Sequence, residues 1–278
     1  MSRIDILMTV KRADASRYYK NLANQDGFNV QIVHEFDDTR GVLADRDQHT
    51  DVLVIDNTLE DVTELVGELR QSYPRLLIIL VDEEADFGMP GQADELSTEP
   101  FNNDDLVKRI QRLMSDRQME TLRSDSLPAV RDFAKTLRSA SGVSGKQQAG
   151  VQAAIDMGYE YVAYYHADTG GLNLKAKAGP SAIQSIAPKQ ASTEDLMSWV
   201  AQNGQSRIAA PQDELNHPLV ARGRLGAAAC VPVSFNGVTY GVMAACRDRP
   251  GSINQENVLM LELISSQLAA AISKEQYR

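Results

Sequence analysis

The sequence has few cysteines, an excess of acidic over basic residues and no long apolar run. Two cysteines among 278 residues cannot build a disulfide framework. Basic residues number 28 against 38 acidic ones, and the net charge of −10 disfavours nucleic acid as a partner. Because no apolar run is long enough for a signal peptide or a membrane span, we expect a cytoplasmic protein with no membrane association.

The rest of the composition is that of an ordinary folded protein. Hydrophobic residues make up 43 % and charged residues 24 %, which excludes a wholly disordered chain. A length of 278 residues suits two domains. The patterns described below predict a first domain over residues 1–116, a helical linker over 117–127 and a second domain over 128–278.

Strand and helix patterns alternate along the first hundred residues. The runs DVLVIDN (51–57) and RLLIILV (75–81) are almost continuously apolar, which is typical of strands covered on both faces. Further strands are predicted over 4–10, 28–36 and 95–101, and helices over 13–25, 39–47, 62–73 and 104–114. This order predicts an α/β domain, with a parallel sheet and helices on both faces.

A different order of elements follows residue 128. Strands are predicted over 160–167, 172–179, 227–235 and 238–246, and helices over 129–139, 145–157, 193–204 and 255–276. The dipeptide Asn236-Gly237 separates the last two strands and is a strong signal for a two-residue hairpin. We therefore predict an α+β domain whose antiparallel sheet is flanked by helices.

Three features of the first domain point to a known family. They are the strand DVLVID ending in Asp56, the glycine at position 27 after the first helix, and the run ADELSTEPF (93–101). Together they resemble the receiver domain of bacterial response regulators. The resemblance implies a flavodoxin-like, CheY-like parallel sheet, and it matches Asp56 to the carboxylate that accepts a phosphoryl group in that family.

Four positions depart from the receiver pattern. The family holds Mg²⁺ with an acidic pair after the first strand, where this chain has Val10 and Lys11. It has a hydroxyl residue where this chain has Val81, and a lysine where this chain has Glu99. Phosphoryl transfer needs cations to neutralise the charge on the transferred group. We predict a degenerate pseudo-receiver; the alternative is a two-component response regulator that is phosphorylated on Asp56 and uses the second domain as its output.

Three stretches of the second domain resemble a GAF domain, a small-molecule-sensing module of signalling proteins. They are EYVAYYHADTGGLNLKAKAG, WVAQNGQSRIAAP and HPLVARGRLGAAACVPVSFNGVTYGVMAA. The resemblance implies binding of an unknown small effector, dimerisation, or both. The residues with which family members attach bilins or bind cyclic nucleotides are absent, and no metal-ligand spacing is present. Haem would need His166 or His217 as axial ligand, and we expect no cofactor.

Several side chains of these stretches are candidates for the lining of a ligand pocket. They are Tyr164, His166, Trp199, Cys230 and Met243. Core packing is the competing interpretation for the aromatic side chains.

The turn at Asn236-Gly237 predicts the register of the last two strands. A two-residue turn pairs Cys230 with Met243 and Cys246 with Ala227. The two cysteines would then point to opposite faces of the sheet, which excludes a disulfide between them. This geometry counts against thiol redox catalysis of the kind found in free-methionine sulfoxide reductases, an enzymatic branch of the GAF fold.

Negative charge is concentrated in the first hundred residues, which hold 21 acidic and nine basic side chains. The stretch 82–99 contains Glu83, Glu84 and Asp86 and has no basic residue. Our hypothesis is that a protein partner with a basic surface docks there. A solvated acidic loop is the alternative.

Two helices have features of a dimer interface. One is the possible long helix over 104–124, and the other carries an apolar stripe of Val258, Leu261, Ile264, Leu268 and Ile272. Each stripe could instead cover the sheet of its own domain. We therefore expect a non-catalytic signal-transduction protein, a homodimer, in which the pseudo-receiver docks a partner and the GAF domain binds an effector.

Overall fold

The computed structural model describes residues 3–83, 92–124 and 128–276. Two compact units form: the first comprises Met1–Arg70 and Leu76–Glu120, and the second comprises Gln71–Arg75 and Thr121–Arg278. Glu84 and Asp86, two of the proposed partner-docking residues, lie outside the described residues. None of the helices in the described part of the chain is both long and apolar enough to cross a bilayer.

The N-terminal unit is built on a five-stranded parallel sheet with strand order β2-β1-β3-β4-β5. Its strands are β1 (Ile4–Thr9), β2 (Phe28–Val33), β3 (Val52–Asp56), β4 (Leu77–Val81) and β5 (Glu95–Ser97). Its helices are α1 (Ala15–Leu22), α2 (Phe36–Ala44), α3 (Val62–Ser72) and α4 (Asp105–Ser124). This strand order is that of flavodoxin-like folds, including CheY. The predicted fold class is confirmed for this unit.

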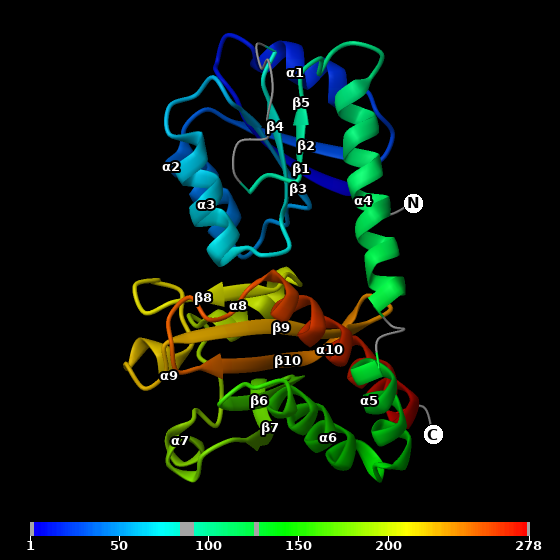
Figure 1. Cartoon of the computed structure of the whole chain (residues 1–278), viewed down its shortest axis with the longest axis vertical. Helices are drawn as coiled ribbons and strands as arrows, with labels where there is room; N and C mark the ends of the chain where they lie inside the picture. The colour runs from blue at the N-terminus through cyan, green and yellow to red at the C-terminus, as the bar shows by residue number, and fades with distance from the viewer. Residues whose placement is uncertain (1–2, 84–91, 125–127, 277–278) are drawn as a thin grey trace. The chain divides into compact units, whose positions relative to one another are not determined.

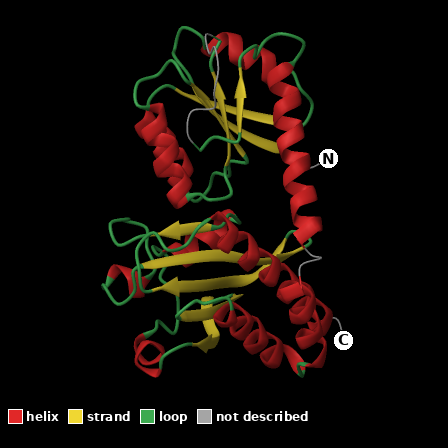
Figure 2. Cartoon of the chain, viewed as in Figure 1, coloured by secondary structure: helices red, strands yellow, loops and turns green. Residues whose placement is uncertain are grey.

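Hydrophobic residues on both faces explain this architecture. All five residues of β3 are buried, as expected for a central strand covered by helices on both sides. Side chains of α1 and α4 share one core cluster with β1, β3 and β4. Figures 1 and 2 show α2 and α3 on the other side of the sheet. The carboxyl ends of β1, β3 and β4 therefore meet at one edge, where Asp56 lies.

The C-terminal unit contains an antiparallel five-stranded sheet with order β7-β6-β10-β9-β8. Its strands are β6 (Tyr161–Asp168), β7 (Gly171–Ala178), β8 (Arg207–Ala209), β9 (Ala227–Phe235) and β10 (Val238–Arg247). Its helices are α5 (Pro128–Ser139), α6 (Gly142–Asp156), α7 (Ser181–Ile186), α8 (Leu196–Asn203), α9 (Pro218–Ala221) and α10 (Gln255–Gln276). Helices α5, α6 and α10 pack on one face of this sheet, as Figure 1 shows. The predicted antiparallel α+β class is confirmed.

The register of the β9–β10 hairpin differs from the predicted one. Val238 pairs with Phe235 as expected, but a β-bulge at Tyr240 shifts every later pair by one residue. Cys230 therefore lies opposite Ala244, and not opposite Met243. Cys246 lies opposite Ala228, and not opposite Ala227. Because side chains alternate along a strand, this one-residue shift brings both cysteines to the same face, and the predicted opposite-face arrangement is wrong.

Glycine is required at the bulge. A Cβ atom on Gly241 would overlap the carbonyl oxygen of Tyr165 in β6 and lie 3.0 Å from the Tyr164 ring. The close approach of β10 to β6 therefore depends on a residue without a side chain. The Tyr164 hydroxyl donates a hydrogen bond to the carbonyl of Tyr240 at 2.9 Å, which ties β6 to the bulged residue.

The apolar stripe of α10 is used inside its own domain. Val258, Leu261, Ile264, Leu268 and Ile272 are all buried in the core cluster beneath the sheet. The alternative that this stripe covers its own sheet is therefore the one observed. The predicted long helix is also present, since α4 runs without a break through 20 residues. Homodimerisation itself stays a prediction.

Candidate functional site

Asp56 is the last residue of β3, and its carboxylate is already engaged. The residue is 6 % exposed. Its Oδ1 atom accepts a hydrogen bond from the backbone N–H of Thr58 at 3.0 Å and another from the Thr58 hydroxyl at 2.7 Å. This carboxylate therefore caps the loop that follows its own strand.

The four positions that depart from the receiver pattern follow or end strands β1, β4 and β5 of the same sheet. Val81 pairs with Asp56 across β3 and β4 and is buried. Val10 follows β1 and is also buried, whereas Lys11 is exposed. Glu99 follows β5 and accepts a hydrogen bond from the side-chain amide of Asn102 at 2.9 Å.

These residues do not fit the magnesium site of a receiver. Mg²⁺ requires oxygen ligands in octahedral geometry, and neither a valine nor an ammonium group can supply them. Lys11 and Val10 stand where the acidic pair is needed. Within the described ranges, acidic, histidine and cysteine side chains form no group of three suited to a metal ion. Val10 and Lys11 therefore cannot supply the magnesium ligands that the acidic pair supplies in a receiver.

Aromatic and charged side chains of α1 and its neighbours lie next to this site. Burial raises the pKa of Tyr18 above its ordinary value, and the negative charges of Asp56 and Glu83 raise it further. The Tyr18 ring lies 4.8 Å from that of Phe101. The guanidinium of Arg17 lies 3.7 Å from the Phe101 centroid and pairs with Glu83 at 3.0 Å. The sequence pattern placed Tyr18 only on a helix face and did not predict its closeness to Asp56.

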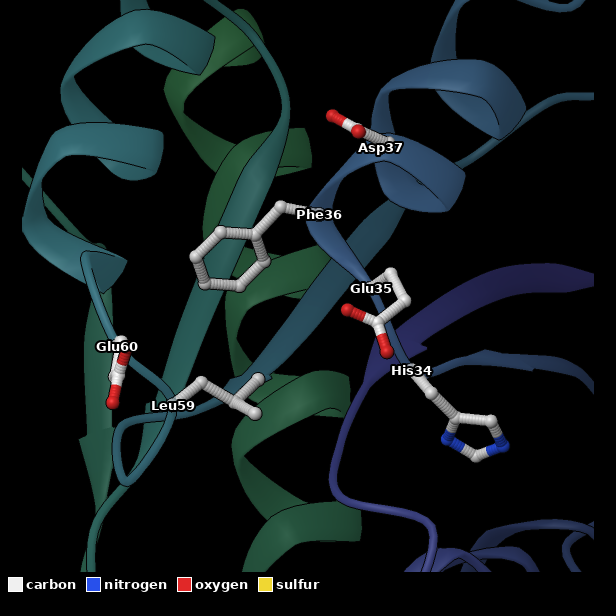
Figure 3. Close-up of a pocket in the computed structure, with 6 residues that line it drawn as sticks. All are labelled: His34, Glu35, Phe36, Asp37, Leu59 and Glu60. Carbon is white, nitrogen blue, oxygen red and sulfur yellow. The ribbon is translucent and has the colours of Figure 1, made fainter.

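A small pocket opens at the same end of the sheet, beyond β2 and β3. It encloses about 370 Å³ and is lined by His34, Glu35, Phe36, Asp37, Leu59 and Glu60. Figure 3 shows the Phe36 ring and the Leu59 side chain between the carboxylates of Glu35 and Glu60. His34 is fixed by a 2.9 Å hydrogen bond between its Nδ1 atom and the carbonyl of Val10. The acidic character of this domain thus extends to the edge of the sheet that carries Asp56.

The second unit concentrates polar side chains on the sheet face opposite α6 and α10. The bulge places Cys230 and Cys246 on this face, and Cys246 pairs with Tyr161 of β6. The Sγ atom of Cys246 lies 4.0 Å from Nδ1 of His217. Asp195 caps α8 by accepting the N–H of Ser198 at 3.0 Å. Two thiols, an imidazole, a phenol and a carboxyl group therefore occur together in the interior.

Burial keeps most of these groups uncharged. It raises the pKa of both thiols far above the ordinary value, and that of Tyr165 likewise. It lowers the pKa of His217 to about 4, because a charged imidazolium would lose its hydration. Burial also raises the pKa of Asp195, although backbone N–H groups bonded to its carboxylate act in the opposite direction.

In this region, the Nε2 atom of His217 lacks a hydrogen-bond partner among the described residues. The Nδ1 atom of His217 accepts the N–H of Leu219 at 3.2 Å, so the neutral ring carries its proton on Nε2. That Nε2 atom is buried and has no acceptor among the described residues. The hydroxyl of Tyr161 is also buried, and its interaction with the Tyr165 side chain partly offsets the rise that burial causes in its pKa. Buried polar groups without a partner are rare, and each costs about 1–3 kcal/mol when left unsatisfied.

Comparison with known proteins places the second unit in a family. Residues 147–273 match the family model described as "GAF domain". The C-terminal unit is a GAF domain. Two solved structures similar to it are the GAF domain of an Acinetobacter phosphoenolpyruvate-protein phosphotransferase and a free methionine-R-sulfoxide reductase from Neisseria meningitidis. The first is 17 % identical, with a TM-score of 0.46, over 54 % of this chain and 93 % of its own. The second is 14 % identical, with a TM-score of 0.46, over 52 % of this chain and 86 % of its own.

The comparison with curated proteins finds a transcriptional regulator that is similar to part of this chain. The transcriptional regulatory protein CpxR of Klebsiella pneumoniae subsp. pneumoniae is 28 % identical over 115 residues. The match covers 39 % of this chain and 48 % of the relative, so this chain spans about half the length of that protein. With the strand order of the N-terminal sheet, this similarity fits a receiver domain followed by the GAF domain.

The predicted pocket residues of the GAF domain divide between the two faces of its sheet. Tyr164 and Met243 lie in the core beneath α6 and α10. Cys230 lies on the opposite face, where its pKa responds to the charge of Asp195 at the start of α8. Trp199 of α8 is fully buried. The five residues therefore do not line one common pocket.

His166 is half-buried near the end of β6, and its Nδ1 atom lies 3.1 Å from the Tyr164 hydroxyl. Sequence reasoning missed Asp195 and the approach of Cys246 to His217. The acidic residue before a helix at 196–203 is an N-cap signal that identifies Asp195, but no local pattern predicts the Cys246–His217 contact.

Proposed function

We propose that this chain is a non-catalytic signal-transduction protein. Receiver-like and GAF domains in one chain indicate a role in signalling, and the finer assignment rests mainly on the phosphoacceptor site. Asp56 is bonded to Thr58, and valine and lysine occupy the places of the magnesium ligands. A phosphoryl group placed here would lack the cation that phosphoryl transfer needs, and it would face the carboxylate of Glu99. The N-terminal domain would then act by docking a protein partner.

The GAF domain is proposed to bind a small effector on the sheet face that carries His217. The unpartnered Nε2–H of His217 supports this assignment, because a ligand that accepted a hydrogen bond from it would recover its desolvation cost. Anionic ligands are disfavoured, since burial keeps His217 uncharged and Asp195 is the nearby ionisable acid. No cofactor is included in the proposal.

Thiol chemistry is a weaker candidate function. The cysteines share a face, but Cys230 is opposite Ala244, so Cys246 is its diagonal neighbour. Diagonal neighbours lie about 7–8 Å apart, near the upper limit for a disulfide. Burial raises the pKa of both thiols, so the reactive thiolate is scarce near neutral pH.

Phosphorylation on Asp56 is the second candidate, because the residue occupies the carboxyl end of β3 and the domain is similar to part of CpxR.

The deciding experiment incubates the full chain with acetyl phosphate and Mg²⁺ and measures intact mass. We expect no phosphoryl adduct. A variant that combines Val10→Asp, Lys11→Asp and Glu99→Lys restores the missing groups, and we expect it to gain an adduct that Asp56→Asn removes. An Asp56-dependent adduct on the unmodified chain would establish the second candidate instead.

The proposed docking of a protein partner is tested by weakening its electrostatic attraction to this domain. We propose that a basic partner binds the acidic surface that includes Glu83, although Arg17 already pairs with that carboxylate. Once a partner is identified, its affinity should fall as salt increases and should fall again when Glu83, Glu84 and Asp86 are changed to amides. Salt-insensitive binding would contradict this proposal.

The proposed homodimer is tested by light scattering at tens of micromolar protein, a concentration that detects even weak interfaces. A monomer under these conditions would contradict it.

A further inference from the structure

A second candidate binding region lies on the helical side of the GAF domain, away from His217. A pocket of about 770 Å³ opens where the end of α5, the start of α6 and the last turns of α10 meet. Figure 1 shows these three helices together near the C-terminus. Pockets that hold small molecules generally enclose about 300–1,000 Å³, so this one is of suitable size.

A partly buried ion pair joins two of the helices that line this pocket. Lys146 is 8 % exposed, and its Nζ atom lies 3.2 Å from Oε1 of Glu275. The same Nζ donates to the carbonyls of Leu137 and Ala140 at 3.3 and 3.4 Å. The ammonium group of Lys146 therefore joins α5, α6 and α10. Because Glu275 balances its charge, the pocket keeps its shape without a ligand.

The walls combine apolar surface with an unsatisfied acceptor. Leu137, Ala134, Ala270 and Ala271 line the pocket and present only carbon atoms from their side chains. Gln267 also lines it, and its side-chain oxygen is buried without a hydrogen-bond partner among the described residues. Rotation of the Gln267 side chain toward the pocket would bring this oxygen within reach of an N–H or O–H group of a ligand.

Two free cations complete the lining. Lys274 and Arg138 are exposed residues of the pocket, and no ion pair involves either side chain in the described part of the chain. The Nε–H of Arg138 donates a hydrogen bond to the carbonyl of Ala134 at 3.1 Å. The first turn of α6 also begins here, at Gly142, and carries no acidic residue. The charged side chains of the lining, three basic and one acidic, therefore give the opening a net positive charge, in contrast to the acidic N-terminal domain.

We propose that this pocket binds a small anionic amphiphile that carries a hydrogen-bond donor. Its carboxylate, sulfonate or phosphate group contacts Lys274 and Arg138, its apolar body covers the alanines and Leu137, and its donor reaches Gln267. This site is independent of the effector site proposed on the opposite face, so either can fail without affecting the other.

Anilinonaphthalenesulfonate is a suitable probe, because it combines an anionic group, an apolar body and one N–H donor. N-phenylnaphthylamine has the same body and donor without the charge. We expect the full chain to bind one anilinonaphthalenesulfonate with enhanced fluorescence. Lys274→Gln and Arg138→Gln should each weaken this binding about three- to fivefold, the range for a partly exposed ion pair, and leave the uncharged probe unaffected. Gln267→Leu should weaken both probes.

Lys175→Gln is the matched control, because Lys175 is an exposed lysine on β7 outside the pocket. It should leave both affinities unchanged. Failure of the folded protein to bind the anionic probe, or equal affinity in the Lys274, Arg138 and control variants, would overturn the proposal. Loss of the signal as protein concentration rises would also overturn it, because a second copy would then cover the pocket.

Discussion

Replacement of His217 by asparagine tests whether the interior of the GAF domain holds this histidine neutral. His217 is 0 % exposed, and its Nδ1 atom caps α9 by accepting the N–H of Leu219. An asparagine oxygen can accept the same hydrogen bond, since asparagine is among the most favourable N-cap residues. The substitution therefore removes the titrating group and preserves the cap.

The expected magnitude follows from the displaced pKa. Burial lowers the pKa of His217 from 6.5 in the unfolded chain to about 4. Between these two values the unfolded state binds more protons than the folded state, so the folded domain loses stability as the pH falls. The loss between about pH 7 and pH 5 is about 2 kcal/mol, and it approaches about 3 kcal/mol below the folded pKa.

The assay uses the single tryptophan of the chain, Trp199, which is buried in the GAF domain. Urea unfolding followed by its fluorescence gives the free energy of unfolding of this domain at each pH. We expect the unmodified chain to lose about 2 kcal/mol more than His217→Asn between about pH 7 and pH 5. His166→Asn, at a half-buried position of the same domain, should retain the steep pH dependence. Equal pH dependence of the unmodified chain and His217→Asn would refute the reasoning.

Two further predictions concern the same sheet. Gly241→Ala should lower the free energy of unfolding of the GAF domain by about 2 kcal/mol, because the added methyl group overlaps the carbonyl oxygen of Tyr165. Urea unfolding followed by Trp199 fluorescence checks this, and an unchanged midpoint would show that β10 can move away from β6. Cys230 and Cys246 should react with a chromogenic disulfide reagent only when the domain unfolds, since both are 0 % exposed and burial raises both pKa values. Rapid labelling of the native protein would contradict the buried, neutral state of these thiols.

Much of the fold was predictable because hydrophobic periodicity is a local property. The continuous apolar runs over 51–57 and 75–81 correspond to the central strands β3 and β4. The predicted helix over 255–276 matches α10 residue for residue. The three-residue strand β8 was not predicted, because a segment this short becomes a strand only by pairing with β9.

The candidate sites were predictable to different extents. The departure from the receiver pattern at Val10 and Lys11 is a matter of residue identity, and it needed only the position of the first strand. The position of Tyr18 beside Asp56 depends on how α1 packs on the sheet, which brings together residues 38 positions apart in the chain. The Lys146–Glu275 pair beneath the helical pocket joins segments even farther apart.

The sequence by itself determined most of the elements, their order in the two domains and the residues that depart from the receiver pattern. The tertiary structure decided which side chains lie on the same face of the sheet in the GAF domain. The bulge at Tyr240 shows the physical reason: it forms where the backbone of Gly241 approaches a carbonyl of a distant strand. A shift of one residue then turns each following side chain to the other face of the sheet. This shift brings Cys230 and Cys246 to one face of the sheet, where Cys246 lies close to His217. The contacts responsible join distant parts of the chain, so no local sequence pattern could have predicted them.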